Sequence, residues 1–175
     1  MKHLLNFVLV VVVLLGMTGC DSDVTTSNKP SGNSNTTSKE EESKKVYNLN
    51  EDVYLKNSSG EEYRLKITSV SETNDRNEFS DVIANRVVLI SYEYENISME
   101  DDLNISSLNF KVYDKDNNSL ETYPVSVTYS DSIGKGRKSS GSVAYALNND
   151  SNYLELDYYD NIFYSKSDCI FKLEW

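Results

Sequence analysis

Hydrophobic and polar positions divide the chain into three consecutive stretches with different patterns. Residues 4–17 form an almost continuous apolar run of fourteen residues, and residues 21–45 contain one valine but no other large apolar side chain. From residue 46 onward, apolar residues alternate with polar ones in short runs separated by Asn, Asp, Ser and Gly. This period-two pattern is typical of β-strands with one buried face. The sequence therefore predicts a leader, a polar linker and a β-rich domain.

Eight alternating runs follow one another in the last 130 or so residues, and none has a convincing helical period. Their regular spacing and polar turns predict an all-β antiparallel sandwich or barrel of a size that is stable without disulfides. The predicted strands are 53–55, 63–68, 87–95, 108–112, 123–129, 143–147, 154–158 and 169–175. The predicted core comprises Leu65, Ile67, Val88, Ile90, Tyr92, Phe110, Val112, Val127, Val143, Tyr145, Leu156, Phe171 and Leu173.

The apolar run near the start is shorter than the roughly 20 residues that a bilayer-spanning helix needs. It follows the positive Lys2, which is the arrangement of a secretory signal. Residues 17–20, Met-Thr-Gly-Cys, resemble the lipobox of bacterial lipoproteins, in which the cysteine receives diacylglycerol before the leader is removed. Met17 stands where Leu is usual. We predict a signal peptide at 1–19 and lipidation of Cys20; an ordinary signal peptide with a chance cysteine is the alternative.

The linker at 20–45 begins with the predicted lipidated cysteine and is too poor in apolar residues to offset its ordering entropy. We expect a disordered tether, whose 25 residues as a flexible coil would span roughly 25–30 Å. The domain at 46–175 would then be displayed on the outer face of the cytoplasmic membrane of a Gram-positive cell. The membrane, reached through the lipid on Cys20, is the first predicted partner.

Charge and cysteine content narrow the possible functions. The chain has 17 Lys and Arg and 28 Asp and Glu; only Lys2 lies before residue 20, so the net charge beyond that point is −12. Such a charge argues against nucleic acid, which is bound through Lys and Arg. With Cys20 lipidated, Cys169 has no disulfide partner, and its apolar neighbours predict a small buried hydrophobe.

Catalytic chemistry has little support in the sequence. The only histidine, His3, is removed with the leader, which excludes Ser-His-Asp and Cys-His catalysis and the usual zinc sites. Glu93, Glu155 and Asp157 alternate with apolar residues and are expected on solvated faces with ordinary pKa values. We therefore expect no enzymatic activity, no catalytic residue and no cofactor, although acids from separate loops can converge in a fold.

Two polar segments could bind ligands. Asp114, Asp116 and Asn118 match the first three side-chain ligands of a calcium loop, but Ser119 replaces the sharp-turn glycine and Val125 the bidentate glutamate. Because Asp and Asn are also favoured in tight turns, a plain turn is preferred over a metal site. Residues 134–138, GKGRK, are the only dense basic patch and are interpreted as a solvated hairpin loop, with contact to an anionic wall polymer or a partner as the alternative.

The order of strands and turns resembles a family of immunoglobulin-like domains in lipoproteins and secreted proteins of Gram-positive bacteria, the DUF4352 group. The resemblance covers residues 48–175 and rests on segments 63–70, 88–96, 110–117 and 141–145 and on the Gly136 turn. Where the family's turn often carries Gly, this chain has Asn117 and Asn118. The resemblance implies an immunoglobulin-like antiparallel β-sandwich of seven to nine strands and an extracytoplasmic display role, and it carries no site residues across.

These observations favour a non-enzymatic binding or display module. It would engage another protein or an envelope component through its loops or an open sheet edge. A small-ligand or metal-ion binder, with calcium at Asp114, Asp116 and Asn118 as its most testable form, is the alternative. The sequence identifies no specific partner.

Overall fold

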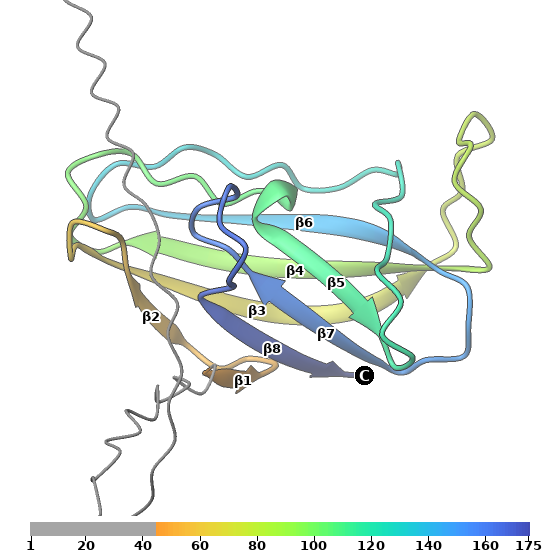
Figure 1. The fold of residues 1–175 in the computed structure, drawn as a ribbon. Coiled ribbons are helices and arrows are strands. Elements are labelled where there is room, and N and C mark those ends of the chain that lie inside the picture. The colour runs from red at the N-terminus through yellow and green to blue at the C-terminus, as the bar shows by residue number, and fades with distance from the viewer. Residues whose placement is uncertain (1–44) are drawn as a thin grey trace, which may run out of the picture. The chain divides into compact units, whose positions relative to one another are not determined.

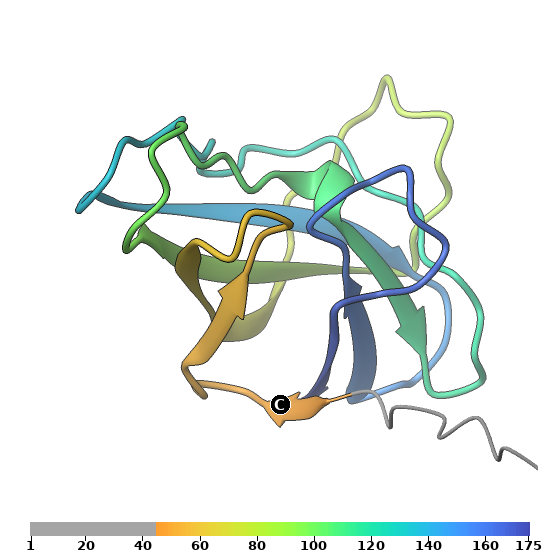
Figure 2. The same cartoon turned by 60° about the vertical axis from the view of Figure 1, so that its left-hand side comes forward.

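The computed structural model describes residues 45–175, which fold into two four-stranded sheets packed face to face (Figures 1 and 2). The first sheet has the order β1 (Val46–Asn48), β8 (Cys169–Glu174), β7 (Tyr153–Tyr158) and β5 (Phe110–Asp114). The second has the order β2 (Val53–Lys56), β3 (Glu62–Thr73), β4 (Arg86–Asn96) and β6 (Lys138–Leu147). A single 3₁₀ turn, η1 (Ser107–Asn109), precedes β5. Within residues 45–175, no helix has the length and apolar character needed to cross a membrane.

The core lies between the two sheets, and it confirms the alternation seen in the sequence. In β3 the inward residues are odd-numbered up to Ile67, and a register shift between Ile67 and Ser69 then turns Val70 inward. In β4 the even-numbered residues point inward, and both sets pack against β7 and β8. Of the thirteen predicted core residues, all are buried except Val127. The predicted all-β immunoglobulin-like sandwich is thus confirmed, with eight strands.

The predicted strands 123–129 and 108–112 differ from the structure, and one further strand is present. Segment 123–129 is not a strand, although its apolar residues alternate. Pro124 has no N–H to donate to a ladder, and the chain leaves the neighbouring strand at this point. Conversely, the short strand β1 was not predicted; it pairs with β8, and this pairing is parallel. Leu108, predicted in a strand, lies on η1 and is 71% exposed.

A second, smaller apolar cluster covers the outer face of the second sheet. Val87 of β4 and Ala144 and Ala146 of β6 pack there against Tyr123. Val127 is half-buried beside this cluster, which explains why it is absent from the main core. The segment from Glu121 to Thr128 therefore wraps around the edge of β6, and the space beneath it forms the candidate site.

Candidate binding groove

The outer edge of β6 is covered by the preceding chain at its two ends. At one end, Ala146 N–H donates to Glu121 O (2.9 Å) and Tyr123 N–H donates to Ala144 O (2.8 Å). At the other, Ser142 N–H donates to the carbonyl of residue 128 (2.8 Å). These bonds hold segment 121–128 beside β6 as an incomplete additional strand.

Between these two ends the ladder is open. Val125 N–H donates to Tyr123 O (3.0 Å) within the same segment. Thr128 N–H donates to the Ser142 hydroxyl (2.8 Å) and not to a backbone carbonyl. Because N–H and C=O of one strand residue point to the same side, Ala144 N–H and Ser142 C=O also face the gap. Neither has a partner among the hydrogen bonds of the described residues. The gap is thus a short stretch of unpaired sheet edge.

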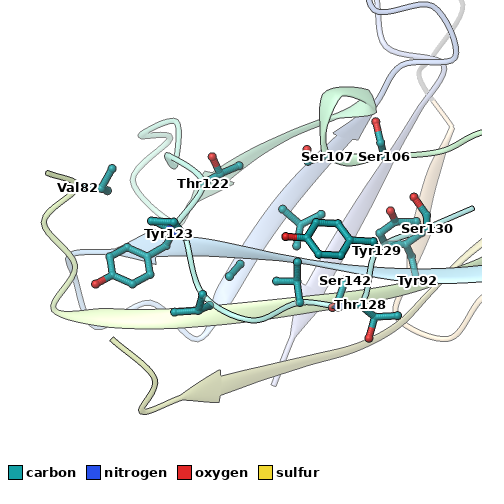
Figure 3. A pocket seen from close by; sticks show the side chains of 15 residues that line it. Val82, Tyr92, Ser106, Ser107, Thr122, Tyr123, Thr128, Tyr129, Ser130 and Ser142 are labelled. Carbon is teal, nitrogen blue, oxygen red and sulfur yellow. The ribbon is translucent and has the colours of Figure 1, made fainter. Parts of the chain in front are cut away.

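A groove of about 470 Å³ opens at this gap (Figure 3). Figure 3 shows Ser106 and Ser107 of the η1 region on one side of the groove and Tyr129 and Ser130 on the other, with β6 beneath them. No charged side chain lines the groove, although 26% of the chain is charged. Its lining consists of Val82, Tyr92, Ser106, Ser107, Thr122, Tyr123, Pro124, Val125, Val127, Thr128, Tyr129, Ser130, Ser142, Val143 and Ala144.

Tyrosines form both the wall and the rim of the groove. Tyr92, from β4, is buried, and its hydroxyl donates to Ile105 O (2.9 Å). Burial raises the pKa of Tyr92 above its usual value, so its hydroxyl stays protonated near neutral pH. Tyr129 at the rim is 84% exposed. Phe79, from the loop between β3 and β4, is 94% exposed and lines a neighbouring hollow with Tyr129. The site therefore offers aromatic surface, hydroxyl groups and unpaired backbone.

The predicted calcium turn is an intramolecular hydrogen-bond network. Asp114 is 5% exposed, and its Oδ1 accepts from the N–H groups of Asp116 and Asn118, both at 2.9 Å. Its Oδ2 accepts from the side-chain amides of Asn118 (3.0 Å) and Asn149 (2.9 Å). Burial alone would raise the pKa of Asp114, but these donors hold it below its ordinary value. Both oxygens thus already have N–H partners, which favours the plain turn.

The backbone of the turn also suits its sequence. Asn117 has φ 61°, the left-handed conformation that Asn tolerates better than most residues. Among the described residues, no group of three or more His, Cys, Asp or Glu side chains could hold a metal ion.

The basic loop at 134–138 is a turn with ion-paired lysines. Arg137 N–H donates to Gly134 O (3.1 Å), and Gly136 has φ 75°, which suits glycine. Lys135 pairs with Glu100, and Lys138 Nζ lies 3.1 Å from Glu95 Oε2. These acids reduce the positive charge that the loop presents, which favours the solvated-turn interpretation.

Two acids, Asp157 and Asp160, are partly or largely removed from solvent. Asp157, predicted on a solvated face, is buried at 7% exposure because Tyr159 folds over it, with the Tyr159 hydroxyl 3.4 Å from Asp157 Oδ2. Asp160 is half-buried and accepts from the Tyr63 hydroxyl (2.9 Å); burial raises its pKa. No pattern in the sequence distinguished Asp160. Cys20 and the predicted leader lie outside the described residues.

The solved structures that are similar to this chain include three bacterial proteins. The secreted protein MPT63 from Mycobacterium tuberculosis has a TM-score of 0.56 at 12% identity, with 74% of this chain and 96% of that chain covered. The yjhA protein from Bacillus subtilis has a TM-score of 0.52 at 15% identity, with 73% and 98% covered. The candidate lipoprotein ycdA from Bacillus subtilis has a TM-score of 0.50 at 19% identity, with 64% and 36% covered. At these identities the likeness shows the fold alone.

Sequence comparison gives one family. No curated protein sequence matches that of this chain. The family described as a domain of unknown function, DUF5067, matches residues 24–160, which is most of the chain. The resemblance to the DUF4352 group stays a prediction.

Proposed function

We propose that this chain, which belongs to the DUF5067 family, is a membrane-anchored extracytoplasmic module that binds an extended, uncharged segment of a partner in the groove beside β6. The module acts without catalysis, and a lipid on Cys20 holds it to the membrane. The partner is a protein or another component of the cell envelope. Its chain would complete the open ladder of β6, as in other cases of strand addition to a sheet edge.

The interrupted ladder carries this proposal. Ala144 N–H and Ser142 C=O lie side by side along one edge and are separated by the spacing that an extended backbone matches. Apolar residues such as Val125 and Val143 beside the gap suit a ligand with small or apolar side chains. The absence of charge in the groove lining disfavours an ionic ligand, which would lose hydration without gaining a charged partner.

The extracytoplasmic location has independent support. The predicted leader ends at Gly19 and is followed directly by Cys20, the arrangement of a lipoprotein signal. The similar structures include one protein described as secreted and one described as a candidate lipoprotein. Because the chain beyond Cys20 is acidic, the anionic lipids of a bilayer would repel it. Attachment would therefore depend mainly on the lipid bound to Cys20.

Photocrosslinking in intact cells tests the groove. Benzoylphenylalanine in place of Tyr129 puts a photoreactive group at the rim, and the matched control places it at Tyr54, which is 64% exposed on β2 at the opposite edge of the same sheet. We expect an adduct from position 129 and none from position 54. The adducted peptide, identified by mass spectrometry, should be an uncharged segment. Equal adducts at both positions would contradict a site in the groove.

A charge placed in the groove separates binding from folding. Ser107 is exposed, lines the groove and makes no side-chain hydrogen bond in the described part of the chain, so Ser107→Asp should fold normally. It should abolish the adduct at position 129. Leu108→Asp, at the next exposed residue outside the groove, is the control and should leave the adduct intact.

A small neutral ligand is the second candidate, because the groove volume of about 470 Å³ falls within the roughly 300–1,000 Å³ typical of ligand pockets. Such a ligand would raise the melting temperature of the purified protein and would produce no protein adduct. Ser107→Asp should then lower the affinity for the ligand, and no protein adduct should form with or without this substitution.

A further inference from the structure

Three consecutive apolar side chains protrude from the loop between β7 and β8. Ile162, Phe163 and Tyr164 are 46%, 88% and 62% exposed. Single exposed apolar residues are common on soluble domains and need no explanation. A run of three on one loop presents a continuous apolar tip to whatever lies beyond it.

Hydrogen bonds close the base of this loop and shape its tip. At the base, Asp160 N–H donates to Asp168 Oδ2 (2.8 Å). At the tip, Phe163 N–H donates to Asn161 Oδ1 and Tyr164 N–H to Asn161 O, both at 3.0 Å. The loop is therefore braced in a conformation that holds the apolar run away from the domain.

The loop lies at the end of the sandwich where the chain enters the domain. β1 and β8 run parallel, so both begin at the same end, and Ile170 N–H donates to Lys45 O (3.0 Å). Asp168, the last residue of the loop, immediately precedes β8. The loop between β3 and β4, which carries Phe79, lies at the opposite end of the domain (Figure 1).

Lys45 and the apolar tip lie at the same end of the domain. Only 24 residues lie between Cys20 and Lys45, so a lipid on Cys20 would tie this end of the domain to the bilayer. Tyrosine is enriched at membrane interfaces, where its ring is apolar and its hydroxyl stays hydrated, and phenylalanine is among the residues that interfacial segments bury. The loop carries Lys166 against two acids, so its attraction to a bilayer would be apolar and not electrostatic.

We infer that the run 162–164 enters the interfacial layer of the same bilayer that holds the lipid anchor. This inference rests on the proposed lipidation of Cys20. The contact gives the domain a fixed orientation, with the β7–β8 loop toward the membrane and the β3–β4 loop away from it. Phospholipid is the occupant; because the chain is acidic, anionic headgroups add no attraction.

Tryptophan quenching measures the contact directly. The mature lipidated chain is reconstituted into phosphatidylcholine vesicles that contain brominated lipid, in a Trp175→Phe background that removes the only native tryptophan. Phe163→Trp reports from the proposed contact, and Phe79→Trp reports from the opposite end as the matched control. We expect the tryptophan of F163W to be quenched at least several-fold more than that of F79W. Replacing half of the phosphatidylcholine by phosphatidylglycerol should not increase the quenching.

The outcomes separate this inference from the anchor on which it rests. If the chain floats with vesicles but F163W and F79W are quenched equally, the lipid anchor stands and the membrane contact is wrong. If the chain with Cys20 intact carries no lipid and does not float, the proposed anchoring fails. The emission of F163W is also measured in solution without lipid. A blue shift of this emission that grows with protein concentration would show that a second copy of the chain covers the loop, and would overturn the inference.

Discussion

Gly141 lies opposite Tyr92 in the ladder between β4 and β6, and a side chain at position 141 would collide with the Tyr92 phenol. An added Cβ would lie 2.5 Å from Tyr92 Oη and 2.7 Å from Cζ. The missing side chain lets the phenol lie across β6 and reach Ile105 O, at 2.9 Å. One wall of the groove therefore depends on a glycine in the middle of a strand, where glycine is otherwise unfavourable.

Gly141→Ala should destabilise the domain by about 1–3 kcal/mol, the range for overpacking in a buried site. The phenol cannot rotate away freely, because its hydroxyl is bonded to Ile105 and its ring packs against Phe110 with centroids 5.0 Å apart. Urea denaturation measures the change. Gly134→Ala is the control: its Cβ would meet only the exposed side chain of Asp102, at 3.3 Å, so its effect should be small.

The sandwich could be predicted because apolar residues alternate along most of its strands, as in the first half of β3, where Tyr63, Leu65 and Ile67 are all fully buried. The same rule failed at 123–129, where alternation is present but the backbone pairs with β6 only near the two ends of the segment. Pro124 was the available signal, since proline within an alternating run argues against a regular strand. The short β1 could not be predicted, because its pairing with residue 170 depends on the assembled fold.

The groove could not be predicted for a related reason. Side-chain pattern indicates which face of a strand is buried, but it does not report whether the backbone at the edge of that strand is paired. The gap at Ser142 and Ala144 follows from the path of the preceding chain. Asp157 shows the same limit: its alternation suggested a solvated face, and Tyr159 covers that face in the folded domain.

Asp114→Asn should destabilise the domain by about 1–3 kcal/mol at pH 7, because it places an amide donor among N–H groups that need an acceptor. The folded pKa of Asp114 lies below its value in the unfolded chain, about 3.9. Its contribution to stability is therefore present above that value and is lost as the pH falls through the folded pKa. The difference between the variant and the wild type should shrink as the pH falls below about 3.9 and through the folded pKa.

The exposed neighbour Asp116 provides the comparison. Among residues 45–175 its side chain accepts one hydrogen bond, from Asn149 at 3.1 Å, so Asp116→Ala should cost much less stability. Calorimetric titration should show no calcium binding by the wild type. Calcium-dependent heat and a raised melting temperature, both lost in Asp116→Ala, would instead support the calcium site.

Asp160→Asn should act in the opposite direction and stabilise the domain at pH 7. Burial raises the folded pKa of Asp160, although the Tyr63 hydroxyl that donates to it opposes the shift. An acid whose pKa is higher in the folded than in the unfolded chain destabilises the fold when it is ionised. This cost is present at pH values above the unfolded pKa and disappears as the pH falls below the unfolded pKa. The amide oxygen can still accept from Tyr63. Thermal unfolding should show a gain at pH 7 and none near pH 3; a loss at pH 7 would contradict this assignment.

Cys169 should be unreactive in the folded domain. It is fully buried, and burial, with Asp168 and Asp157 nearby, raises the pKa of its thiol to about 12. Because the thiolate is the reactive form, alkylation by iodoacetamide at pH 8 should be at least about 100-fold slower in the native protein than in urea. A Cys20→Ala chain leaves Cys169 as the only thiol for this measurement. Rapid modification of the native chain would show that the start of β8 opens readily.

Cys20→Ala tests the anchor on which the proposed location depends. Without the thiol, diacylglycerol cannot be attached, so the variant should accumulate as an uncleaved precursor or appear in the medium. Globomycin, which blocks lipoprotein signal cleavage, should cause the wild type to accumulate as the precursor and should leave the processing of the variant unchanged. Cell fractionation with mass spectrometry of the mature N-terminus measures both effects. The tip residues 162–164 cannot replace the anchor, because a small apolar contact gives only marginal and reversible membrane binding. A variant that stays in the membrane fraction as a processed mature chain would show that something other than a lipid on Cys20 holds this protein at the membrane.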